Sequence, residues 1–246
     1  VRLAARRPSP HAPSRFDTPT RLPPPPQRPT MRAMKLYSAP MPAPNPRRVR
    51  IAAAEKGIAL DEVMLDLRAR AHRSPEHLAR NSLGQVPVLE LDDGTTIAET
   101  VSICRYLDAL HPEPPLFGRT PLEQAQVDMA IRRVETQLGE PVKMYWRHAH
   151  PATAALLTQY KDYGASNRDG LDRAMTWFDR ELADGRAFVA GDTFTMADIA
   201  AVTILDFGTL IGMAPLGDDT APDRAPDRTN ARAWHARIAA RPSYAA

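Results

Sequence analysis

The sequence predicts a protein of two domains, an α/β domain with the element order βαβαββα followed by an all-helical domain. Three observations support this prediction. Residues 34–110 alternate short apolar runs with helical periodicity, residues 111–119 form a proline-rich linker, and residues 120–246 show helical periodicity alone. With 246 residues, of which 43% are hydrophobic, the chain is long enough to build both cores.

Residues 1–33 are expected to form a disordered extension. They are rich in proline and arginine and cannot bury enough apolar surface to fold. Organelle transit peptides share the arginine-rich, acid-poor composition, but the prolines oppose the amphipathic helix that such peptides need. We therefore interpret this segment as an over-extended start, with the natural beginning at Met31 or Met34.

The charge balance gives no sign of a nucleic-acid partner. The net charge is +3, but residues 1–33 hold seven Arg and one Asp, so the remaining residues carry a net charge of −3. The longest apolar run, within residues 196–213, is interrupted by Asp198 and Asp206, which excludes a membrane-spanning helix there. We expect neither a nucleic-acid partner nor a membrane partner.

The chain has a single cysteine, Cys104. One cysteine cannot form a disulfide within the chain or build a cysteine-rich zinc site, and we expect no metal. Cys104 lies on the apolar side of a predicted helix, so a buried hydrophobic role is favoured over a nucleophilic one.

The first domain is predicted to open with alternating strands and helices. The predicted elements are a strand at 34–37, a helix at 47–56, a strand at 60–65 and a short helix from Ser74 to about Arg80. Asn45 is the predicted N-cap of the first helix and Pro46 its first residue, and Gly57 is the predicted stop. The intervening helix supplies the crossover that a parallel strand pair requires.

A hairpin and a helix are predicted to complete this domain. Strands at 88–91 and 95–98 flank Asp92-Asp93-Gly94, where glycine supplies the positive φ of a tight turn. Val86-Pro87 precedes the first of these strands, and we predict a cis bond there, which turns the N–H and C=O of Val86 outward toward an extended peptide. The helix that follows, with Thr100 at its cap, offers free N–H groups to a carboxylate.

The second domain is predicted to be helical throughout. The predicted helices are 121–148, with a kink at Pro141, then 165–183, a nearly all-apolar core helix after Thr195, and 229–240. Thr195 and Asp198 form the capping box that starts the core helix. Residues 217–228 are predicted to form a loop.

Two stretches carry a resemblance to a known family. QVPVLELDDGTTIAETVSICRYL resembles the glutathione-binding half of the thioredoxin-like domain of cytosolic glutathione S-transferases, and FVAGDTFTMADI resembles the cap and core helix of their second domain. The resemblance covers Met34 to the end of the chain. It implies a cytoplasmic homodimer that conjugates the thiolate of glutathione, its substrate, to small electrophiles. A glutathione-dependent peroxidase or dehalogenase, or a non-catalytic interaction module of the same fold, remains the alternative.

The resemblance also implies how glutathione is bound. Val86 would pair main chain to main chain with the cysteinyl residue. Glu99 and Thr100 would bind the γ-glutamyl end. His72 would reach the glycyl carboxylate, with Gln85 as a second donor to that group.

The residue that activates the thiol is missing from its usual place. Ala43 stands where serine-type members carry a hydroxyl, and the loop holds no cysteine. The sequence resembles a subgroup in which a serine and a histidine of the second domain hold a water instead. Those two positions fall on Lys143 and Arg147, which lie four residues apart on one helix face and would attract a thiolate. A solvated basic face is the alternative interpretation.

Our hypothesis for the thiolate therefore combines two sources of positive potential. The helix N-terminus near Asn45 contributes its partial charge, and Lys143 or Arg147 supplements it. Ser38 and His148 are nearby candidates, as is His150.

Other residues have both functional and structural interpretations. Arg47 and Arg48 are either anion ligands or partners in inter-domain ion pairs. Four side chains are candidates for lining the electrophile pocket, although packing in the core is favoured for them: Met144, Tyr145, Trp146 and Tyr160.

Overall fold

The computed structural model describes residues 34–40, 42–217 and 228–246. The chain divides into two units, residues 1–30 and residues 31–246. The predicted disorder of residues 1–33 and most of the predicted loop at 217–228 lie outside the described residues.

The first half is built on a four-stranded mixed sheet with the strand order β2-β1-β3-β4. The strands are β1 (Lys35–Ser38), β2 (Asp61–Met64), β3 (Val88–Glu90) and β4 (Thr96–Ala98). β1 and β2 are parallel, and the β1–β3 and β3–β4 pairs are antiparallel. This arrangement confirms the predicted βαβαββα order and the thioredoxin-like fold class.

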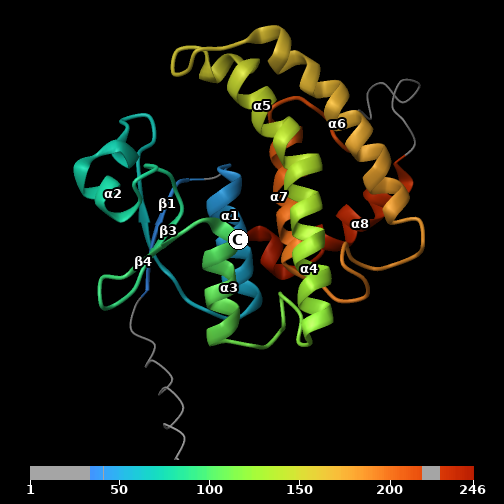
Figure 1. The fold of residues 1–246 in the computed structure, drawn as a ribbon, viewed down its shortest axis with the longest axis horizontal. Helices are drawn as coiled ribbons and strands as arrows, with labels where there is room; N and C mark the ends of the chain where they lie inside the picture. Colours follow the sequence, from blue (N-terminus) through green and yellow to red (C-terminus); the bar gives the residue numbers. More distant parts are fainter. Residues whose placement is uncertain (1–33, 41, 218–227) are drawn as a thin grey trace, which may run out of the picture. The chain divides into compact units, whose positions relative to one another are not determined.

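Three α-helices complete the first half: α1 (Pro44–Glu55), α2 (Pro75–Arg80) and α3 (Thr100–Leu110). A 3₁₀-helix, η1 (Ala71–Arg73), precedes α2. α1 contacts both α3 and α7 (Met196–Leu210), and it lies between the sheet and the helical domain (Figure 1). Apolar side chains from the sheet and from these helices, such as Leu36, Val49 and Ile103, are fully buried together.

Two predicted caps of the first half are wrong. Helix α1 begins at Pro44 with Ala43 as its N-cap, so Asn45 lies inside the first turn. Proline fits the first turn of a helix, and the helix starts one proline earlier than predicted. The N-cap of α3 is Glu99, at a φ of 67°, and Thr100 is its first helical residue without a side-chain cap.

The predicted caps at Ser74 and Thr195 and the predicted stop at Gly57 are confirmed, whereas the helix predicted at 165–183 spans Lys161–Glu181. The Ser74 side chain accepts a hydrogen bond from the His77 N–H at the start of α2. Thr195 and Asp198 form the predicted capping box of α7. Gly57 follows the end of α1 at a φ of 63°, and Val86-Pro87 is cis.

The second half is all helical. Its helices are α4 (Pro121–Arg133), the π-helical segment η2 (Val134–Gly139), α5 (Glu140–His148), η3 (Pro151–Thr153), α6 (Lys161–Glu181), α7, α8 (Thr229–Ala239) and η5 (Pro242–Ala245). Helix α7 is buried over most of its length and forms the core. The break predicted at Pro141 is a widened π-helical turn just before it, since proline cannot donate to the carbonyl four residues earlier.

Buried ion pairs join α1 to the helical half. Arg47 contacts Asp206 at 2.5 Å, and Arg48 contacts Glu135 at 3.2 Å. Both arginine side chains are less than a tenth exposed. The inter-domain interpretation of Arg47 and Arg48 is therefore confirmed.

Cys104 is completely buried in α3, and burial raises the pKa of its thiol to about 12. This environment confirms the structural interpretation of the cysteine. Among the described residues, no helix is long and apolar enough to cross a membrane. The same residues hold no cluster of three or more side chains of the kinds that bind metal.

Candidate active site

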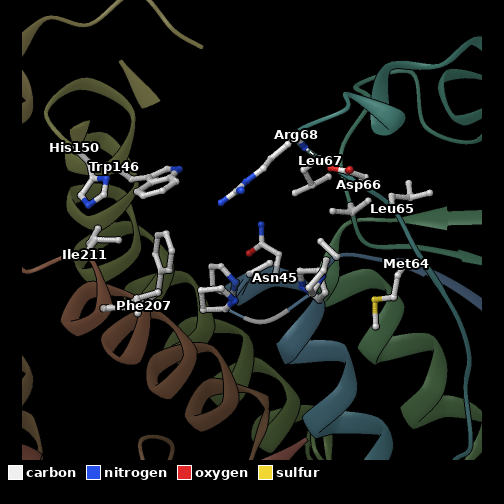
Figure 2. Close-up of a pocket in the computed structure, with 18 residues that line it drawn as sticks. Asn45, Met64, Leu65, Asp66, Leu67, Arg68, Trp146, His150, Phe207 and Ile211 are labelled. Carbon is white, nitrogen blue, oxygen red and sulfur yellow. Dashed lines mark hydrogen bonds between the residues drawn. The ribbon is translucent and has the colours of Figure 1, made fainter. Parts of the chain in front are cut away.

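A cavity of about 960 Å³ lies between the first half and the helical half of residues 31–246 (Figure 2). One side is formed by the loop before α1, by the first residues of that helix and by Val86. The segment from Met64 to Arg68, at the end of β2, forms a second side. The helical half contributes the residues Trp146, His150, Phe207, Leu210 and Ile211.

Val86 lies in this cavity at the point where the sheet begins. Its peptide bond to Pro87 is cis, and Pro87 leads directly into β3. Two hydrogen bonds hold the residue before Val86 in place. The carbonyl of Gln85 accepts them from His77 Nε2 at 3.0 Å and from Asn81 Nδ2 at 3.1 Å. The structure shows no hydrogen bond from the backbone of Val86 to another described residue. These main-chain groups are therefore available for pairing, and the role of Val86 in binding a peptide stays a prediction.

The N-terminus of α1 faces the cavity but has few donors to offer. Pro44 and Pro46 have no N–H. The N–H of Ala43 donates to the carbonyl of Pro40, and the N–H of Arg47 donates to the carbonyl of Ala43. Within the described residues, the backbone N–H of Asn45 is therefore the free donor of this turn, and its side-chain amide points into the cavity (Figure 2).

The N-terminus of α3 is richer in donors. The first helical hydrogen bond runs from the Ile103 N–H to the carbonyl of Glu99, at 3.0 Å. Thr100, Val101 and Ser102 precede it, and none of them is a proline, so each provides an N–H at the helix end. This end lies beside the Val86 loop, because Ala98 of β4 pairs with Val88 of β3. Glu99 and Thr100 do not line the cavity itself.

His72 lies in η1, and it does not line the cavity. Its Nδ1 is buried without a hydrogen-bond partner among the described residues. Burial lowers the pKa of His72, and the neighbouring charge of Arg73 lowers it further. The ring is therefore mainly neutral near pH 7. In this form it can donate or accept a hydrogen bond but carries no positive charge.

The predicted catalytic side chains lie outside the cavity lining. Ser38 is completely buried, and its Oγ accepts a hydrogen bond from Arg50 at 3.1 Å. Lys143 is exposed and pairs with Glu140 at 2.6 Å, while Arg147 is exposed on the same helix. The ring of His148 lies against the rings of Tyr160 and Tyr163. These placements leave their catalytic roles as predictions.

The neighbouring face of α5 and the residues just after it contribute to the cavity instead. Trp146 and His150 line it, and their rings lie 4.7 Å apart. Phe207 of α7 packs edge-on against Trp146, with 5.3 Å between the ring centroids. Of the four predicted pocket side chains, Trp146 lines the cavity, whereas Met144, Tyr145 and Tyr160 do not.

Sequence reasoning missed Arg68 and Phe207. Arg68 follows β2 and Phe207 lies within α7, and no sequence pattern indicated that these two segments border one cavity. In Figure 2 the guanidinium of Arg68 extends from the β2 side into the cavity, toward the side that carries Trp146.

The chain matches known proteins in both halves. Residues 43–110 match the glutathione S-transferase N-terminal domain, and residues 141–242 match the glutathione S-transferase C-terminal domain. Glutathione S-transferase 2 of Saccharomyces cerevisiae is 41% identical over 215 residues, which cover 85% of this chain and 87% of the yeast protein.

Solved structures agree with this match. The crystal structure of Gtt2 from Saccharomyces cerevisiae is similar with a TM-score of 0.75 and 40% identity, and the match covers 86% of this chain and 98% of the yeast chain. A Gtt2-class glutathione S-transferase of Vibrio parahaemolyticus is similar with a TM-score of 0.70 and 30% identity, over 85% of this chain and 95% of that chain. This chain belongs to the glutathione S-transferase family.

Proposed function

We propose that this glutathione transferase binds glutathione along the Val86 loop and conjugates its thiolate to an electrophile held in the cavity beside Trp146. One observation carries the proposal. The free main-chain groups of Val86, the N-terminus of α1 and an apolar wall from the helical half all border a single cavity of about 960 Å³.

Glutathione would be held by its main chain and its two carboxylates. Val86 would pair with the cysteinyl residue. The γ-glutamyl carboxylate would accept hydrogen bonds from the N–H groups at the start of α3, where the helix dipole favours an anion. Glu99 would bind the γ-glutamyl ammonium, and His72 with Gln85 would bind the glycyl carboxylate.

Asn45 is the donor best placed for the thiolate. A free thiol has a pKa of roughly 8.5, so hydrogen bonds to the anion are needed to keep it ionised near neutral pH. Asn45 offers its backbone N–H and its amide on the cavity side. Lys143 and Arg147 would have to stabilise the thiolate from outside the cavity lining.

The activity is tested by conjugation of 1-chloro-2,4-dinitrobenzene, followed by the absorbance of the product. We expect saturation with glutathione and retention of the protein on immobilised glutathione. The non-catalytic alternative predicts retention without enzymatic turnover. A protein that neither binds the resin nor accelerates the reaction would contradict the proposal.

We also propose that the enzyme acts as a cytoplasmic homodimer, in keeping with its family. Sedimentation velocity at micromolar concentration should give the mass of a dimer, and a stable monomer would contradict this. Fractionation of cells of the source organism would test the location.

A further inference from the structure

Among the described residues that line the cavity, Arg68 is the one whose side chain carries a permanent positive charge. Among the described residues, its guanidinium makes no ion pair and no hydrogen bond. The other lining residues are apolar apart from Asn45, Asp66 and His150. An unpaired guanidinium beside a largely apolar cavity is a ready partner for an anion, since it can give a carboxylate two parallel hydrogen bonds.

The backbone of Arg68 is held in a defined turn. The carboxylate of Asp66 accepts hydrogen bonds from the N–H of Arg68 at 2.8 Å and from the N–H of Ala69 at 3.0 Å. The carbonyl of Asp66 accepts a further one from the N–H of Ala71, at 3.0 Å. The carboxylate of Asp66 is thus hydrogen-bonded to backbone N–H groups of this turn. The side chain of Arg68 extends into the cavity (Figure 2).

The opposite wall is aromatic. Trp146 and Phe207 pack edge-on there, and His150 lies against Trp146. The Nδ1 of His150 accepts a hydrogen bond from the N–H of Ala152 at 3.3 Å, so the neutral ring carries its proton on Nε2. A flat apolar molecule can therefore lie against the indole while an anionic group on it faces Arg68.

We propose that Arg68 makes this transferase selective for aromatic or other apolar electrophiles that carry a carboxylate or a similar anion. This inference rests on the proposed function of the cavity. Arg68 contacts the acceptor and does not take part in the bond-forming step. The guanidinium attracts the anionic group of the acceptor both when the acceptor is bound and in the transition state. This attraction weakens as the salt concentration rises.

Ethacrynic acid and its methyl ester form a suitable pair of probes. In both, the thiolate sulfur adds to the terminal carbon of the conjugated double bond, the π electrons pass to the adjacent carbon, and that carbon takes a proton from water. The carboxylate is remote from the reacting bond and does not change. The two compounds therefore differ mainly in charge, and each enzymatic rate is divided by the rate without enzyme.

The measured quantity is the ratio of kcat/KM for the acid to kcat/KM for the ester. The parent should favour the acid, and Arg68→Gln should lower the ratio about fivefold or more, as expected for the loss of a charged hydrogen bond at a partly solvated site. Arg68→Lys should lower it less. Arg70→Gln is the matched control, since Arg70 is exposed in the same segment but does not line the cavity, and its ratio should equal that of the parent.

An acid-to-ester ratio that is the same in the parent and in Arg68→Gln would overturn the inference. If Arg68→Gln also raised the KM for glutathione equally with both acceptors, Arg68 would be assigned to a carboxylate of glutathione instead. Failure of the proposed function is distinct from either, because neither probe would then be turned over by any variant.

Discussion

Replacing Asp198 with asparagine is expected to lower the free energy of unfolding by about 3 kcal/mol or more, because buried donors would lose their acceptor. The carboxylate is completely buried and accepts four hydrogen bonds. They come from the N–H of Val189, the N–H and the hydroxyl of Thr195, and the indole N–H of Trp234, at 2.8 to 3.2 Å. Asparagine keeps one acceptor oxygen and turns an NH₂ group toward two of these donors.

Urea unfolding, followed by far-ultraviolet circular dichroism, measures this loss. Asp162→Asn is the matched control, because Asp162 also lies in the first turn of a helix but is exposed. The free energy of unfolding of Asp162→Asn should fall only by the value of a helix-dipole interaction, about 0.3–1 kcal/mol. Equal losses in the two variants would show that Asp198 acts only through the helix dipole of α7 and not through its buried contacts.

The destabilisation caused by Asp198→Asn should also depend on pH. Burial raises the pKa of Asp198 to about 6, and the four hydrogen bonds oppose this. A raised folded-state pKa means that the native state binds the proton more tightly than the unfolded chain, whose carboxyl has its ordinary pKa. The contribution of this group is therefore fully present below about pH 4 and is lost as the pH rises through 6. Between pH 7 and pH 5 the stability gap between the parent and Asp198→Asn should widen by about 1 kcal/mol.

Replacing Asn45 is expected to have the largest effect on catalysis among the candidates for thiolate stabilisation. Asn45→Ala should raise the pKa of the bound glutathione thiol by about one unit, which corresponds to the loss of one hydrogen bond to a charged group, and should lower kcat/KM about tenfold near neutral pH. Asn45→Asp should raise this pKa further, because it places an anion in the same volume. The same change favours the helix, since a negative side chain in the first turn complements its dipole.

Ultraviolet titration of the bound thiolate measures these shifts. The combined variant Lys143→Ala and Arg147→Ala is the comparison, because both side chains are exposed and neither lines the cavity. We expect its thiol pKa to stay close to that of the parent. A raised pKa in the combined variant together with an unchanged one in Asn45→Ala would restore the sequence-based hypothesis. A large shift on Ser38→Ala alone would contradict both assignments.

Features that depend on a few neighbouring residues could be predicted from the sequence alone. The hairpin turn at Asp92-Asp93-Gly94, the capping box of Thr195 with Asp198 and the stop at Gly57 are each encoded within four residues. The parallel pairing of β1 with β2 followed from the order of the elements, because two parallel strands need a helical crossover between them. The family resemblance rested on the same local patterns, and the comparisons confirm it.

The side chains that face the cavity could not be predicted in the same way, because their orientation depends on long-range packing. Each residue turns a helix by about 100°, so the face of α5 that lines the cavity depends on how the helix packs on α6 and α7. That packing directs Trp146 inward and leaves Lys143 exposed, although both lie in the same two turns. Arg68 joins the site only because β2 ends opposite α5 and α7, a contact between segments far apart in the sequence that no local pattern records.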